Sequence, residues 1–117
     1  MKRLSQIALV SYLLFLLLFS DAFAAGPYDG EWIGSATSTA ARCKPASITL
    51  TVQGKVATGQ ARFQVDSPNI SGTVLEDGTL GATIGFQHLT GKFIQDDFEG
   101  TFKSSNCIWK MLLRRNK

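Results

Sequence analysis

Histidine and cysteine are scarce in this sequence, which contains one histidine and two cysteines among its 117 residues. A metal centre with several imidazole ligands is therefore excluded by count. The single histidine, His88, falls in an expected turn, and neither a Ser-His-Asp triad nor a Cys-His pair can be assembled around it. Most of the glycines fall within expected strands and none precedes an expected helix, so a phosphate-binding loop is absent as well. These absences favour binding over catalysis.

A strong charge of either sign is also missing. The formal net charge is +3, and it falls to +2, ten basic against eight acidic residues, once the first 24 residues are set aside. So small an excess, without a row of exposed aromatic residues, argues against nucleic acid as a partner. The 93 residues that remain (117 − 24) can form one small core. They leave no room for a second domain or a Rossmann-type fold, and no cofactor is expected.

The N-terminus has the pattern of an export signal. Two basic residues precede a thirteen-residue apolar stretch over 7–19, which is followed by small residues at Ala22 and Ala24. This arrangement predicts a signal peptide over residues 1–24 and one domain over residues 25–117. The apolar stretch is shorter than the ~20 residues that a membrane span needs. We therefore expect a periplasmic or secreted protein with no membrane span after cleavage, an uncleaved N-terminal anchor being the alternative.

After the leader, apolar and polar residues alternate with a period of two, and no helical period appears. The expected strands are Gly30–Thr37, Ser47–Gln53, Val56–Gln64, Asn69–Leu75, Thr79–Phe86, His88–Ile94, Asp97–Ser104 and Cys107–Arg115. The connections are short except for the first, and short connections force neighbouring strands to pair antiparallel. The pattern therefore predicts an all-β protein, an eight-stranded antiparallel up-and-down meander that closes into a small barrel.

The two cysteines support closure of this barrel. Cys43 lies in the connection after the first strand, and Cys107 begins the eighth. In a meander both positions fall at the same end, and they become neighbours if the first and last strands pair. A single cysteine pair in an exported protein is expected to be oxidised, so we predict a disulfide. Two thiols that bind a metal are the alternative.

A weak repeat places glycine between two apolar residues on one strand face, at Gly34, Gly72, Gly91 and Gly100, with a paler copy at Gly59 between two alanines. Glycines that face inward let strands bend sharply, as a small barrel requires. A role in close approach to a ligand is the alternative. The inner face also carries seventeen bulky residues: Trp32, Ile48, Leu50, Val52, Phe63, Ile70, Val74, Leu80, Ile84, Phe86, Leu89, Phe93, Phe98, Phe102, Trp109, Met111 and Leu113. These predict a filled interior, since eight strands enclose little more than their own side chains.

The start of the first strand, Gly30-x-Trp32, resembles the G-x-W motif of the calycins, which include lipocalins and avidins. The resemblance implies a tryptophan that closes the barrel floor and packs against an arginine from the last strand. Arg114 and Arg115 stand there, and alternation from Trp109 selects Arg115. The layout also looks like small periplasmic calycin inhibitors of secreted metalloproteases, from which it departs in its second cysteine at the far end of the chain.

Three basic residues, Arg42, Lys44 and Lys103, fall near the expected disulfide and predict a rim for an acidic partner. We therefore expect a non-enzymatic binding module that engages a protein or envelope component through its loops, with hydrolase inhibition as the sharpest form. A lipocalin-type carrier of a small apolar ligand is the alternative, and an apolar cavity of at least ~300 Å³ would favour it. Carboxylates in the opposite turns, around Asp77 and Asp96, leave a cation site or an enzyme as a third hypothesis.

Overall fold

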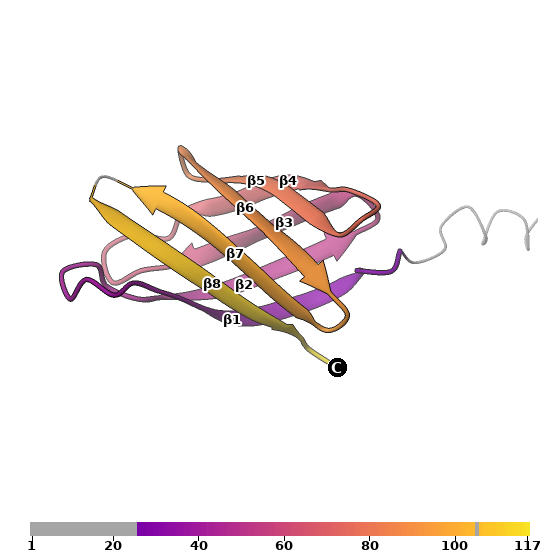
Figure 1. Cartoon of the computed structure of the whole chain (residues 1–117), viewed down its shortest axis with the longest axis horizontal. Helices are drawn as coiled ribbons and strands as arrows, with labels where there is room; N and C mark the ends of the chain where they lie inside the picture. Colours follow the sequence, from indigo (N-terminus) through magenta and orange to yellow (C-terminus); the bar gives the residue numbers. More distant parts are fainter. Residues whose placement is uncertain (1–25, 105) are drawn as a thin grey trace, which may run out of the picture.

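The computed structural model describes residues 26–104 and 106–117, and the expected signal peptide lies outside this part of the chain. Eight antiparallel strands form one closed barrel in the order β1 to β8 (Figure 1). The strands are β1 Gly30–Thr37, β2 Ala46–Gln53, β3 Val56–Arg62, β4 Asn69–Val74, β5 Thr79–Ile84, β6 Gln87–Ile94, β7 Asp97–Ser104 and β8 Cys107–Arg115. The expected all-β meander is confirmed. Within the described ranges, no helix has the length and apolar character to cross a membrane.

The barrel closes because β1 pairs with β8, from Trp32 opposite Arg115 to Thr37 opposite Lys110. The β1–β2, β3–β4, β5–β6 and β7–β8 connections lie at one end of the barrel, which we call the open end. The remaining connections and both ends of the domain lie at the other, the closed end. In Figure 1 the β1–β2 connection and the β7–β8 hairpin lie at the left, and the C-terminus lies at the right.

The alternation that predicts the strands also places the core. Fifteen of the seventeen expected interior residues are buried, and most have less than 2% of their surface exposed. Phe63 is half-buried, and Phe86 is fully exposed, so the expectation for Phe86 was wrong. The reason lies in the turn between β5 and β6. Gly85 has a φ of 60° and begins a two-residue turn there, which directs Phe86 outward and places His88 on the outer face of β6 instead of in the turn.

Two of the glycines show why the repeat exists. A Cβ at Gly34 would collide with the carbonyl oxygen of Leu112 in β8, and one at Gly59 would collide with that of Thr49 in β2. Neighbouring backbones therefore occupy the space of a side chain, as a tightly coiled barrel requires. This contact with protein backbone agrees with a role of the glycines in coiling the strands.

The closed end is sealed by Arg115, the last residue of β8. Its guanidinium carbon lies 4.8 Å from the ring centroid of Trp32, in the contact that the resemblance implies. The same guanidinium donates hydrogen bonds to the carbonyl oxygens of Asp29 (3.2 Å), Pro27 (2.8 Å) and Gln95 (3.3 Å). It thus ties the segment before β1 and the β6–β7 turn to the barrel floor, with a cation over an aromatic face.

Candidate functional site

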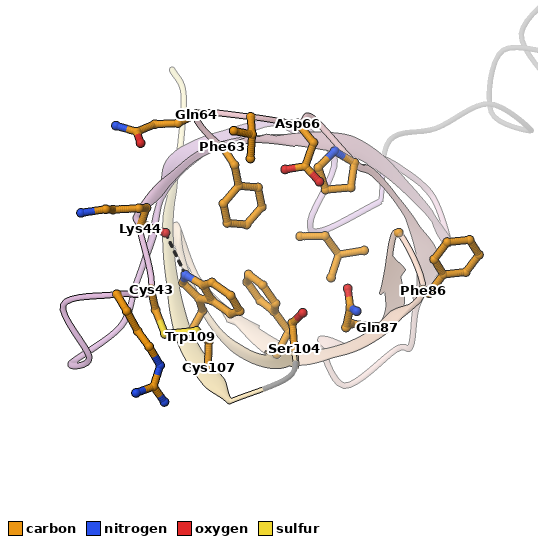
Figure 2. A pocket seen from close by; sticks show the side chains of 16 residues that line it. Cys43, Lys44, Phe63, Gln64, Asp66, Phe86, Gln87, Ser104, Cys107 and Trp109 are labelled. Carbon is orange, nitrogen blue, oxygen red and sulfur yellow. Dashed lines mark hydrogen bonds between the residues drawn. A yellow bond between two sulfur atoms is a disulfide. The ribbon is translucent and has the colours of Figure 1, made fainter.

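The open end holds a pocket of about 580 Å³ (Figure 2). Its apolar lining includes Phe63, Ile84, Phe102 and Trp109, and polar groups from the connections and strand ends surround the mouth. The expectation of a filled interior therefore holds toward the closed end and fails at the open end. The pocket also exceeds the ~300 Å³ at which typical small-molecule sites begin.

Aromatic stacking builds one wall of the pocket. The ring of Trp109 in β8 stacks on Phe102 in β7, with centroids 5.0 Å apart and an interplanar angle of 11°. Phe63 meets the same indole edge-on, at 5.7 Å and 75°. The indole Nε1 donates a hydrogen bond of 3.1 Å to the carbonyl oxygen of Lys44, drawn as a dashed line in Figure 2. The polar edge of Trp109 is thereby satisfied, and its apolar face is left to the cavity.

A disulfide braces the connection that borders this wall. Cys43 and Cys107 are bonded, with Cα atoms 5.8 Å apart, and the expected pairing is confirmed. Arg42 adds a hydrogen bond of 3.1 Å from its guanidinium to the carbonyl oxygen of Asn106. The long β1–β2 connection is therefore held against the start of β8 on both sides of Cys43, which reduces the ordering that binding at the pocket would require.

The three expected rim residues do not form a single group. Arg42 and Lys44 border the pocket, and Figure 2 shows the Lys44 side chain directed away from the cavity. Lys103 lies on the outer face of β7, opposite Ile108, and does not line the pocket. Asp66 in the β3–β4 connection is an acidic residue at the mouth, and its carboxylate is directed over the cavity in Figure 2.

Sequence reasoning missed the pocket, although one signal for it is present. The last inner positions of β1, β2 and β3 before the open end are Ala36, Ala46 and Ala61. Three small residues in a row leave this end of the interior to a few aromatic rings, and one expected ring, that of Phe86, points outward. Small inner residues at one end of successive strands are thus the pattern that predicts an open end.

The carboxylates at the closed end are engaged in local contacts. The backbone N–H of Thr79 donates to Asp77 Oδ1 at 3.0 Å and lowers the pKa of that carboxyl. Lys117 lies 2.7 Å from Asp96 Oδ2, and its hydrogen bond lowers the pKa of Asp96. A general acid needs a raised pKa, so both shifts run against that role. In the described part of the chain, no three His, Cys, Asp or Glu residues gather as metal ligands would.

No protein-family model, curated protein or solved structure matches this chain. The eight-stranded antiparallel barrel is consistent with a calycin-like fold at a coarse level. Function must therefore be argued from the geometry of the open end.

Proposed function

We propose that this protein is an exported, non-enzymatic binding module of calycin-like type that engages its partner through the open end of the barrel. The pocket of about 580 Å³ carries the proposal, because it opens an aromatic lining of the barrel interior to a partner. The partner would be a protein or envelope component that inserts an apolar group against the aromatic wall of the pocket. Inhibition of a hydrolase is one form that such binding could take.

Two further features support this role. The disulfide and the hydrogen bond from Trp109 to Lys44 hold the pocket wall in place before binding. A preformed site binds with a smaller loss of conformational entropy than a mobile loop does. The mouth also offers polar side chains, among them Gln87 and Ser104, which can orient a bound group by hydrogen bonds.

A carrier of a free small apolar ligand is the second candidate. The cavity volume favours it, since about 580 Å³ falls within the range of small-molecule sites, ~300–1,000 Å³. The two candidates share one pocket and differ in whether the apolar group arrives alone or as part of a larger partner. Native mass spectrometry of the protein purified from its exporting cells separates them, because a carrier would retain a small molecule at a one-to-one ratio.

The pocket itself is tested with N-phenyl-1-naphthylamine, a neutral apolar dye that becomes fluorescent out of water. We expect saturable binding with one dye per protein. Gln87→Trp places an indole at the mouth, where Figure 2 shows the Gln87 side chain directed toward the cavity, and should reduce binding at least about tenfold. His88→Trp, one residue further on the outer face of β6, is the matched control and should bind like the wild type.

Two results would count against this proposal. The first is a wild type that fails to bind the dye although its unfolding transition shows that it is folded. Alternatively, the dye binds but both tryptophan variants retain full affinity, which would place the dye elsewhere on the surface.

A further inference from the structure

The two most exposed large hydrophobic side chains both lie at the open end. Val65 in the β3–β4 connection is 95% exposed, and Phe86 in the β5–β6 turn is 99% exposed, while the other exposed large hydrophobic residues reach 44–59%. Both residues border the pocket, and Figure 2 shows the Phe86 ring directed away from the barrel wall. Single exposed hydrophobic residues are common. Here two project from separate connections beside one pocket.

Charge is distributed unequally between the two ends. In the described part of the chain, the open end has four basic residues, Arg42, Lys44, Arg62 and Lys103, against the single acidic residue Asp66, a net charge of +3. The closed end has five basic residues (Lys55, Lys92, Arg114, Arg115 and Lys117) against six acidic ones (Asp29, Glu31, Glu76, Asp77, Asp96 and Asp97), a net charge of −1. Lys110 and Glu99 pair at 3.3 Å on the wall between the ends and cancel. The net positive charge of the domain therefore lies at the open end, where Val65 and Phe86 also project.

From these observations we infer that the open end docks on an anionic lipid surface, with Val65 and Phe86 inserted among the lipids and the basic residues at the headgroups. The inference rests on the proposed function, because it names the envelope component that the open end engages. Apolar side chains with cationic neighbours bind the interface of an anionic membrane through burial and charge together.

A lipid surface fits this end of the barrel better than a protein does. Val65 and Phe86 project from different connections, and the basic side chains Arg62 and Lys103 lie on the outer faces of their strands. A fluid interface accepts separate apolar and basic side chains that form no single patch, whereas a protein partner needs a complementary surface of fixed shape. Docking in this orientation also turns the pocket mouth toward the bilayer, so that a lipid chain can reach the aromatic wall.

Binding to vesicles tests the inference. Vesicles with equal parts of phosphatidylglycerol and phosphatidylcholine are compared with pure phosphatidylcholine vesicles by co-sedimentation of the protein without its leader. We expect binding to the anionic vesicles that weakens at 0.5 M salt and little binding to the zwitterionic ones.

Matched double variants, one at each end of the barrel, then locate the docking surface. Val65→Ser with Phe86→Ser removes the apolar side chains at the open end, and Leu75→Ser with Ile94→Ser removes two from connections and strand ends at the closed end. The open-end pair should lower vesicle affinity at least about tenfold, and the closed-end pair should leave it unchanged.

Two further double variants test the basic residues in the same way. Lys44→Glu with Lys103→Glu and Lys55→Glu with Lys92→Glu each change the net charge by −4, at the open and the closed end respectively. We expect the open-end pair to weaken binding to anionic vesicles at least about tenfold, and to a greater degree than the closed-end pair. Thermal unfolding checks that each variant is folded.

The outcomes separate this inference from the proposed function. A wild type that binds the naphthylamine dye but no anionic vesicles overturns lipid docking, and it leaves an apolar group of a protein partner or a free ligand as the occupant of the pocket. Vesicle binding that both serine pairs reduce equally, or that both lysine pairs reduce equally, also overturns it. A wild type that binds neither dye nor vesicles overturns the proposed function as well.

Discussion

Replacing Arg115 by alanine should destabilise the barrel far more than the same change at its neighbour Arg114. The two residues are adjacent at the end of β8, but their side chains lie on opposite faces. The Arg114 side chain is 82% exposed and pairs with Asp97, whereas Arg115 lies over the buried ring of Trp32. The comparison therefore separates the structural contribution of the closed end from the effect of losing one positive charge.

The magnitude follows from the contacts of Arg115. A guanidinium over an indole contributes about 0.5–2 kcal/mol. Three carbonyl oxygens lose a charged donor, and Asp96, whose Oδ1 lies 3.3 Å from Arg115 Nε, loses part of its ion pairing. Water can replace some of these partners at a partly open site, so we expect a total loss of about 2–4 kcal/mol. The surface pair of Arg114 should contribute below about 1 kcal/mol.

Thermal unfolding followed by circular dichroism measures both changes. For a domain of this size, Tm falls by about 4–8 °C per kcal/mol, so Arg115→Ala should lower it by at least about 8 °C. Arg115→Lys should restore only part of the lost stability. An ammonium keeps the positive charge, but it cannot donate hydrogen bonds from a planar group to several carbonyl oxygens at once. Equal and small shifts for Arg114→Ala and Arg115→Ala would refute the reasoning.

Three further predictions concern stability. Changing both Cys43 and Cys107 to alanine should lower the free energy of unfolding by on the order of 4 kcal/mol, since the disulfide joins residues 64 apart in sequence; a loss below about 1 kcal/mol in urea unfolding would contradict this. Gln95→Gly should raise stability by up to about 1 kcal/mol, because this residue has a φ of 55° that glycine adopts without strain, and a lower Tm would speak against it. The lowered pKa of Asp96, caused mainly by its bond with Lys117, contributes stability above the ordinary value of 3.8 and loses it as the pH falls through the lowered pKa. Asp96→Asn should therefore flatten the stability profile below about pH 4, and an unchanged slope there would exclude this contribution.

Much of the barrel could be predicted because a single physical rule governs it. Strict alternation reveals which residues face inward, and short connections force sequential pairing, so the closure between β1 and β8 and the disulfide follow from the sequence. The bounds of β1, β7 and β8 agree with those predicted. Turn geometry was harder, because alternation continues through Gly85 and Phe86 while a positive φ at Gly85 ends the strand.

The candidate site was less accessible to sequence reasoning for a related reason. A list of bulky inner residues predicts how much volume they occupy in total but not how they divide between the two ends. Trp32, Phe93 and Phe98 gather toward the closed end, where rings contact one another at 4.7 Å. At the open end, the ring of Phe86 was expected in the interior but is exposed to solvent. The pocket is the consequence of this uneven division, which depends on strand register and turn geometry.

The connections show the same inequality between the ends. Two-residue turns occur at both ends, at 54–55 and 95–96 at the closed end and at 85–86 at the open end, and Arg115 holds three carbonyl groups together at the closed end. The two longest connections, 38–45 and 63–68, both lie at the open end. A tight turn closes the barrel as well as a longer connection does. Longer connections are the places where binding surfaces evolve on a rigid scaffold. The disulfide braces one of these connections without covering the pocket, which is the arrangement expected if the closed end stabilises the fold and the open end is kept for a partner.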